Sequence, residues 1–137
     1  MNNSLHNKKI LIVGGSSGIG LAISKQVYKT GGQLIIASRN AVEKNNDLAS
    51  VIGNGIETYS FDITSENETV KALEKIGEID HLVITARPEI FPAPFVETDI
   101  KQAKEAFETK FWGQYQLIQK VQRSEERRVG KECRSRW

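Results

Sequence analysis

Short apolar runs alternate with longer amphipathic segments along the first 85 residues of the chain. Three of the runs, residues 10–13, 33–38 and 81–85, are short and strongly apolar, and residues 56–61 alternate between apolar and polar. Such segments are typical of strands, and the continuous apolar runs indicate strands that are buried on both faces. Helical spacing of apolar residues follows each of the first three strands. The pattern therefore predicts alternating strands and helices, which is an α/β fold.

One helix is expected before the second strand and one after it. The first begins near Ile19 and covers residues 20–30, with Ser24 and its polar neighbours toward water. The glycine pair 31–32 ends this helix, as glycine does just past a helix C-terminus. The second helix covers residues 41–52 and is polar on most of its faces.

A third and a fourth helix are expected in the second half of the chain. Ser65 and Glu68 have the spacing of a capping box, which begins a helix that runs through Ile76. Three prolines then exclude regular structure after the fourth strand. A long helix starts near Asp99, and its apolar face is predicted to hold Ile100, Ala103, Phe107, Phe111, Ile118 and Val121.

The connections between consecutive strands decide the topology. Each is long enough to cross over and pair the strands in parallel. Right-handed crossovers then give a doubly wound parallel sheet with strand order 3-2-1-4. In such a sheet a ligand binds beyond the carboxyl ends of the strands, where the order reverses between strands 1 and 4.

The glycines that follow the first strand lie at this expected ligand edge. Gly14, Gly15, Gly18 and Gly20 connect the strand directly to the first helix. Glycine lets the backbone turn sharply and approach a ligand closely, since it has no Cβ atom. The first turn of the helix adds unpaired N–H groups and the positive end of the helix dipole. Together these features predict an anion site suited to the pyrophosphate of a dinucleotide.

Residues 123–137 need separate treatment, because they are identical to the in-frame translation of a common sequencing adapter: Arg-Ser-Glu-Glu-Arg-Arg-Val-Gly-Lys-Glu-Cys-Arg-Ser-Arg-Trp. We interpret this segment as a non-native tail and residues 1–122 as a partial nucleotide-binding domain. The alternative is a natural basic tail that binds nucleic acid.

Setting the tail aside changes the charge and the cysteine count. The segment holds six of the 19 Lys and Arg residues and three of the 17 Asp and Glu residues, so the net charge falls from +2 to −1. The positive charge of the whole chain therefore comes from the tail, and we expect no nucleic-acid partner for residues 1–122. The chain's single cysteine, Cys133, also lies in the tail. Residues 1–122 thus offer no disulfide, cysteine-based zinc site or cysteine nucleophile, and we assign no metal ligands.

The glycine-rich stretch carries a family resemblance. Residues 13–20 read Val-Gly-Gly-Ser-Ser-Gly-Ile-Gly, which is similar to the Thr-Gly-x-x-x-Gly-x-Gly motif of the short-chain dehydrogenases/reductases. The chain resembles the first half of such an enzyme, truncated after about four strand-helix units. The resemblance implies a Rossmann-like NAD(P)-binding fold. It also implies that the dinucleotide phosphates are lined by Gly14, Ser16, Ser17, Gly18, Ile19 and Gly20. For Ser16 and Ser17, turn and helix-cap roles are the alternative.

Ser38 and Arg39 follow the second strand, where the family distinguishes its two cofactors. NAD-preferring relatives carry an acidic residue here that hydrogen-bonds the ribose 2′-hydroxyl. Serine has no charge to repel a 2′-phosphate, and a guanidinium group matches phosphate oxygens in a bidentate fork. The sequence therefore favours NADP(H) over NAD(H). The alternative interpretation of Arg39 is a solvated surface charge.

Further cofactor contacts are implied after the third and fourth strands. By resemblance, Asp62 faces the adenine amino group and Ile63 touches the ring; alternatively, Asp62 only caps the approach to the next helix. Thr85 and Ala86 stand in the family's Asn-Asn-Ala-Gly segment, near the nicotinamide ribose. Arg87 replaces the glycine of that segment, so either the loop shifts or the arginine contacts cofactor or substrate.

The catalytic groups of the family are expected beyond residue 122. The family uses a serine and a tyrosine with a lysine four residues later, and no tyrosine of this chain has that lysine. Lys110 stands where the family has the asparagine of its catalytic tetrad. We therefore assign no catalytic residue and expect the fragment to be inactive. Phe111 and Trp112 are expected in core or subunit-interface packing.

These observations predict an NADP(H)-dependent oxidoreductase acting on a small-molecule alcohol or carbonyl, with a full-length parent that is a homo-oligomer. A non-catalytic NADP(H)-binding sensor or scaffold is the alternative, motivated by Arg87 and Lys110. A methyltransferase dependent on S-adenosylmethionine shares a glycine turn, but Ser38 and Arg39 stand where it usually has an acidic residue. No membrane partner is expected. The polar N-terminus lacks a signal core, which predicts a cytoplasmic location.

Overall fold

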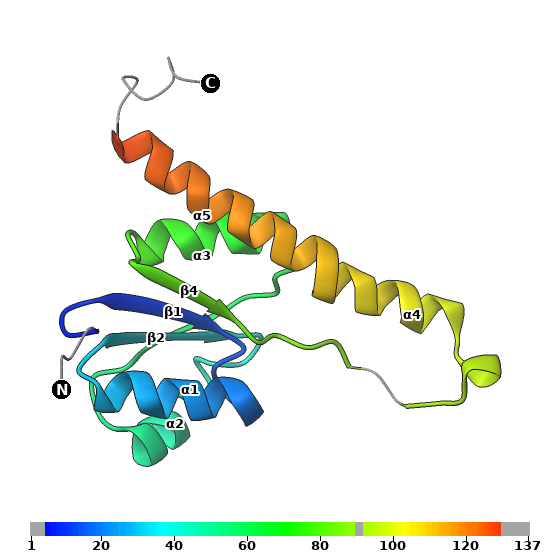
Figure 1. The fold of residues 1–137 in the computed structure, drawn as a ribbon, viewed down its shortest axis with the longest axis horizontal. Coiled ribbons are helices and arrows are strands. Elements are labelled where there is room, and N and C mark those ends of the chain that lie inside the picture. The colour runs from blue at the N-terminus through cyan, green and yellow to red at the C-terminus, as the bar shows by residue number, and fades with distance from the viewer. Residues whose placement is uncertain (1–4, 90–91, 130–137) are drawn as a thin grey trace.

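A parallel sheet forms the centre of the computed structural model, which describes residues 5–89 and 92–129, with side chains through residue 123. In this part of the chain the sheet has four strands in the order β3-β2-β1-β4. The predicted parallel pairing and order are thus confirmed (Figure 1). The strands are β1 (Lys9–Val13), β2 (Gln33–Ser38), β3 (Glu57–Ser60) and β4 (His81–Ile84).

Helices cover both faces of the sheet (Figure 1). One face is covered by α1 (Gly18–Lys29) and α2 (Asn45–Ile52), and the other by α3 (Glu66–Ile76) and α5 (Gln114–Val129). Before α5, the chain forms a short 3-10 turn (Phe95–Glu97), α4 (Ile100–Phe107) and a π-helical segment (Glu108–Gly113). No helix of the described residues is long and apolar enough to span a bilayer.

The central strands have side chains on both faces, which divides the core into two layers. Leu11 and Ile35 belong to the layer under α3 and α5, whereas Ile12 and Ile36 belong to the layer against α1 and α2. All four are fully buried. Burying a side chain of this size stabilises the fold by about 1.5–3 kcal/mol. This two-sided burial explains why β1 and β2 read as continuous apolar runs.

The second helix begins later than predicted. Residues 41–44 form turns, and α2 starts at Asn45. Ala41 is fully buried in the layer against α1, and the backbone N–H of Val42 donates to Ser60 Oγ at 3.0 Å. These contacts hold the segment close to the sheet, so tertiary packing decides its conformation.

The predicted capping box of α3 forms in part. Ser65 Oγ accepts a hydrogen bond from the backbone N–H of Glu68. The Glu68 carboxylate reaches past Ser65 and accepts from the backbone N–H of Asp62 at 2.9 Å. The cap therefore also fixes the chain that leaves β3.

The long helix begins at Ile100 with Asp99 as its N-cap, close to the predicted start, but its buried face differs from the predicted one. Gly113 and Leu117 are buried, whereas Ile100, Phe107, Phe111 and Ile118 are at least half exposed. The π-helical segment contributes to the difference, because its wider turn shifts the helix register between α4 and α5. In addition, α4 extends past the sheet (Figure 1) and buries none of its residues. Phe111 and Trp112, which were expected in core or subunit-interface packing, are therefore not in the core.

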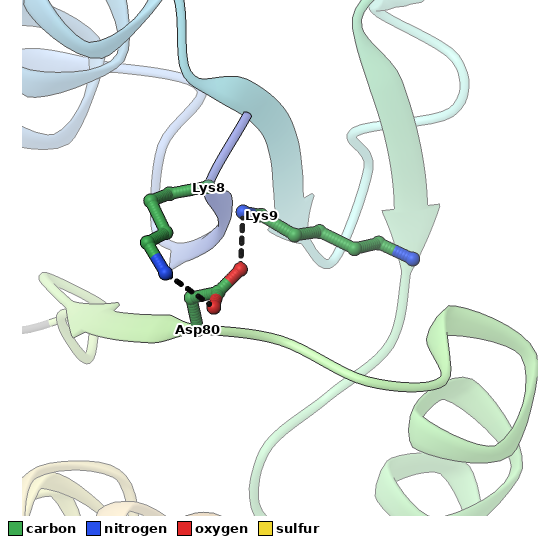
Figure 2. A network of polar contacts seen from close by, with 3 residues as sticks. All are labelled: Lys8, Lys9 and Asp80. Atoms are coloured by element: carbon green, nitrogen blue, oxygen red, sulfur yellow. Dashed lines mark hydrogen bonds and ion pairs between the residues drawn. The ribbon is translucent and has the colours of Figure 1, made fainter. Parts of the chain in front are cut away.

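Asp80 joins the amino ends of β1 and β4 (Figure 2). Its carboxylate accepts from the backbone N–H of Lys9 at 2.8 Å and from Lys8 Nζ at 3.3 Å. The backbone hydrogen bond, with help from Lys8, holds the pKa of Asp80 below its usual value. Lys9 Nζ donates to the carbonyl of Ile76, near the C-terminus of α3, at 2.6 Å.

We expect Asp80→Asn to lower the thermal midpoint slightly at pH 7 and to lower it by less near pH 3. A folded-state pKa below the unfolded value stabilises the fold above the unfolded pKa, and this contribution is lost as pH falls through the folded pKa. Melting curves at both pH values would measure the change in thermal midpoint. Glu74→Gln, which removes an exposed carboxylate from α3, is the control. An Asp80→Asn deficit that is the same at both pH values would contradict the electrostatic role.

Candidate functional site

The predicted site residues lie at the carboxyl edge of the sheet. Because the strands are parallel, the chain leaves all four of them at this edge (Figure 1). In sheet order the edge carries Asp62 after β3, Arg39 after β2, the glycine turn after β1 and Thr85 after β4. The structure thus brings together residues that are up to 71 positions apart, and a hydrogen bond joins Thr85 to Gly14.

The glycine turn is packed so tightly that it excludes side chains. Gly14 has a φ of 92° and its N–H donates to the Ala37 carbonyl at 2.7 Å. A Cβ atom on Gly20 would lie 2.1 Å from the Gly14 carbonyl oxygen, and a Cβ atom on Gly14 would lie 2.6 Å from the Ala86 nitrogen. Real Cβ contacts essentially never fall below 3.0 Å. Glycine is therefore required at both positions.

Ser24 joins α1 to the glycine turn through its hydroxyl. Its hydroxyl is fully buried and lies 2.9 Å from the Gly20 carbonyl and 3.2 Å from the Gly15 carbonyl. The prediction that Ser24 faces water is wrong. The buried positions of α1 are Gly20, Ser24 and Val27, so the helix turns its Ser24 face toward the sheet.

Thr85 connects β4 to the same turn. Its backbone N–H donates to the Val13 carbonyl at 2.8 Å, and its hydroxyl donates to the Gly14 carbonyl at 3.1 Å. The hydroxyl also closes the space beside Gly20, where a Cβ atom would lie 2.4 Å from it. Thr85 and the half-buried Ala86 are therefore part of the wall of the turn.

The two serines of the turn have different partners. Ser16 Oγ lies 3.1 Å from Ser38 Oγ, which ties the turn to the end of β2. Ser17 occupies the N-cap position of α1, but its side chain makes no capping hydrogen bond. Ile19, in the first turn of α1, is 76% exposed. The amino end of α1 is thus open to solvent and uncapped by a side chain, as an anion site requires.

Arg39 projects from the end of β2 and is partly solvated. Its Nη2 atom lies 3.0 Å from Glu89 Oε1, and the two side chains are 59% and 77% exposed. No pattern in the sequence links Glu89 to Arg39, because the two residues are 50 positions apart. Ser38, next to Arg39, is held by Ser16.

Asp62 and Ile63 lie beyond β3. Asp62 Oδ1 accepts from the backbone N–H of Thr64 at 2.9 Å and from its hydroxyl at 2.8 Å, which is the turn-capping geometry. The Ile63 side chain is buried in the core, where it packs beside Gly113 of the π-helical segment. Its carbonyl accepts from the Gln116 side chain. Contacts of Asp62 and Ile63 with an adenine ring stay predictions.

Two cations occupy positions where the family motif has neutral residues. Arg87 is exposed after β4 and makes no hydrogen bond or ion pair with another described residue. Lys110 is exposed on the π-helical segment. The described residues contain no group of three or more histidine, cysteine, aspartate or glutamate side chains placed to hold a metal ion.

The arrangement fits a dinucleotide. A turn that admits no Cβ atom at Gly14 or Gly20, an open amino end of α1 and a neighbouring guanidinium provide close backbone approach, N–H donors and positive charge for phosphates.

Comparison with known proteins agrees with this geometry. A family model described as short chain dehydrogenase matches residues 8–131. An uncharacterized oxidoreductase of Mycobacterium tuberculosis is 28% identical over 130 residues, covering 88% of this chain and 38% of the relative. Serine 3-dehydrogenase of Agrobacterium fabrum is 33% identical over 108 residues, covering 76% of this chain and 43% of the enzyme. The chain thus spans about two fifths of these relatives.

A solved structure has a similar fold. The 3-ketoacyl-(acyl-carrier-protein) reductase of Brucella melitensis, crystallised with NADH, superposes with a TM-score of 0.74 at 26% identity. The match covers 85% of this chain and 49% of the reductase. The predicted α/β, Rossmann-like fold is confirmed.

Proposed function

Because the chain belongs to the short-chain dehydrogenase family, we propose that it is the NADP(H)-binding part of an oxidoreductase that acts on a small alcohol or carbonyl compound. When bound, the nicotinamide cofactor supplies or accepts the hydride. The observation that carries the proposal is the glycine turn beside Arg39, where a Cβ atom on Gly14 or Gly20 would clash with the backbone and with Thr85.

The order of residues along the carboxyl edge supports an assignment of each part of the cofactor. We assign the adenine to Asp62 and Ile63, and the 2′-phosphate to Ser38 and Arg39. The pyrophosphate is assigned to the turn, through Gly14, Ser16, Ser17, Gly18, Ile19 and Gly20. Thr85 and Ala86 are assigned to the nicotinamide ribose. Adjacent strands of a sheet lie about 4.8 Å apart, so an extended dinucleotide can reach from β3 to β4.

NADP(H) rather than NAD(H) is proposed because of the charge after β2. Arg39 offers a guanidinium there, and its neighbour Ser38 carries no charge that would repel a phosphate. The Brucella melitensis reductase binds NADH in its crystal structure, so the fold alone does not favour NADP(H). The preference therefore rests on the residues of this chain.

We further propose that the catalytic serine and Tyr-x-x-x-Lys lie after Gln122 in the parent protein, and that residues 123–137 are not native. The share of the relatives that the chain spans supports a longer parent protein. The family match runs to residue 131, so the proposed boundary at Gln122 lies inside the matched range. Sequencing the gene past codon 122 should reveal both motifs, and its full-length product should oxidise NADPH with small carbonyl compounds.

The result that separates catalysis from sensing is turnover. A gene that lacks the serine and Tyr-x-x-x-Lys, with a product that binds NADPH without oxidising it, would favour a non-catalytic sensor or scaffold. Arg87 and Lys110, which stand at the family's glycine and asparagine positions, are the residues that motivate this second candidate.

The predicted cytoplasmic location remains a prediction of the sequence.

The outer face of the long helix is the proposed homo-oligomer surface. Phe111, Trp112 and Tyr115 are each more than half exposed, and their rings contact one another, with 4.8 Å between the centroids of Phe111 and Trp112. An apolar cluster of this kind exposed on a helix marks an interaction surface.

Phe111→Ser in the full-length protein should therefore dissociate the oligomer, as light scattering coupled to size exclusion would measure. Phe95→Ser is the matched control, because Phe95 is also exposed but lies on the short 3-10 turn before α4. We expect the control to keep the wild-type mass. A Phe111→Ser variant that also keeps it would contradict the assignment of this surface.

A further inference from the structure

The ion pair between Arg39 and Glu89 brings the segment that follows β4 to the end of β2. Thr85 lies against the glycine turn at the end of β1, and four positions later Glu89 contacts Arg39. Because β1 lies between β2 and β4 in the sheet, residues 85–89 pass across the end of β1. The Arg39–Glu89 pair therefore lies at the edge where the cofactor is proposed to bind.

We propose that Glu89 is a specificity-determining residue, because its carboxylate occupies the guanidinium that the 2′-phosphate of NADP(H) would use. The inference rests on the proposed assignment of Arg39 to that phosphate. Carboxylate and phosphate oxygens both accept hydrogen bonds from guanidinium N–H groups, so they compete for the same donors. A 2′-phosphate has to displace Glu89, whereas a cofactor with a free 2′-hydroxyl brings no competing anion.

The exposure of the pair sets the size of the effect. Arg39 and Glu89 are 59% and 77% exposed, so water competes for both groups and the pair exchanges easily. Exposed ion pairs contribute little to stability, and loss of this competitor should change affinity by about two- to fivefold. Glu89 therefore moderates the preference for NADP(H) without abolishing it. Displacement of Glu89 also breaks the contact between the segment after β4 and the end of β2. Binding of the 2′-phosphate is therefore coupled to the position of that segment.

The test compares two adenosine probes that differ by the 2′-phosphate. Adenosine 2′,5′-bisphosphate and adenosine 5′-monophosphate would be titrated calorimetrically into the 137-residue chain and its variants. Glu89→Gln keeps the size of the side chain and removes its charge. Glu97→Gln is the matched control, because it removes an exposed carboxylate farther along the same connection. Arg39→Ala and the double variant Arg39→Ala/Glu89→Gln complete a cycle.

We expect Glu89→Gln to tighten the bisphosphate two- to fivefold, to leave the monophosphate unchanged, and to have no effect when Arg39 is alanine. Glu97→Gln should change neither probe. An unchanged bisphosphate affinity in Glu89→Gln, with weaker binding in Arg39→Ala, would overturn the role of Glu89 and leave the NADP(H) proposal standing. No effect of Arg39→Ala on the ratio of the two probes would overturn both. A Glu89→Gln effect that persists without Arg39 would reflect general charge and would also overturn the inference.

Discussion

Replacing Gly20 with alanine should abolish dinucleotide binding and destabilise the chain. The new Cβ atom would lie 2.1 Å from the Gly14 carbonyl oxygen and 2.4 Å from Thr85 Oγ1. The oxygen belongs to the backbone of the turn, so relieving the clash must move either the turn or α1. Overpacking of this kind typically costs about 1–3 kcal/mol of stability. The same movement removes the close backbone approach that a pyrophosphate needs.

Two measurements on Gly20→Ala separate the site from the fold. Titration with NADPH should show no binding, and denaturant unfolding should show a lower free energy. Gly55→Ala is the matched control, because Gly55 has a φ of 86° but open space around its Cβ position. This control should lose stability through backbone strain alone and still bind NADPH. A Gly20→Ala chain that binds NADPH like the wild type would show that the turn does not hold the cofactor.

Arg39→Ala should weaken NADPH binding by about 10- to 100-fold and leave NADH binding within about twofold. The reason is that a charge-assisted, bidentate contact forms only with the 2′-phosphate, which NADH lacks. Fluorescence titration of the full-length protein with both cofactors would measure the ratio of the dissociation constants.

Arg87→Ala provides the control for Arg39→Ala. Arg87 is another exposed arginine on the segment after β4, so it tests whether any positive charge near the site gives the same selectivity. It should alter the two cofactors alike. An NADPH-to-NADH ratio that does not change in Arg39→Ala would refute the role assigned to this residue.

The parts of the fold that depend on local pattern were predictable. The apolar runs of β1 and β2 are buried on both faces, so burial and sequence agree there. The connection lengths and the rule of right-handed crossovers were sufficient for the strand order. The glycine turn was also predictable, because its backbone geometry permits only glycine at positions 14 and 20 and the glycines are visible in the sequence.

The parts that depend on contacts outside the hydrophobic pattern were not predictable. Ser24 is polar by composition, but it is buried with its hydroxyl within hydrogen-bonding distance of the Gly15 and Gly20 carbonyls. The π-helical segment changes which face of the long helix is buried, and helical periodicity assumes a constant turn. The pairing of Glu89 with Arg39 depends on where the chain goes after β4, which no spacing in the sequence encodes.

The most direct test of the NADP(H) site is a crystal structure of the protein grown with NADP⁺. We predict that the pyrophosphate contacts the backbone N–H groups between Gly14 and Gly20, and that the 2′-phosphate contacts the guanidinium of Arg39 in place of Glu89. Density for the nucleotide elsewhere on the protein, or a 2′-phosphate with no contact to Arg39, would contradict the proposed site.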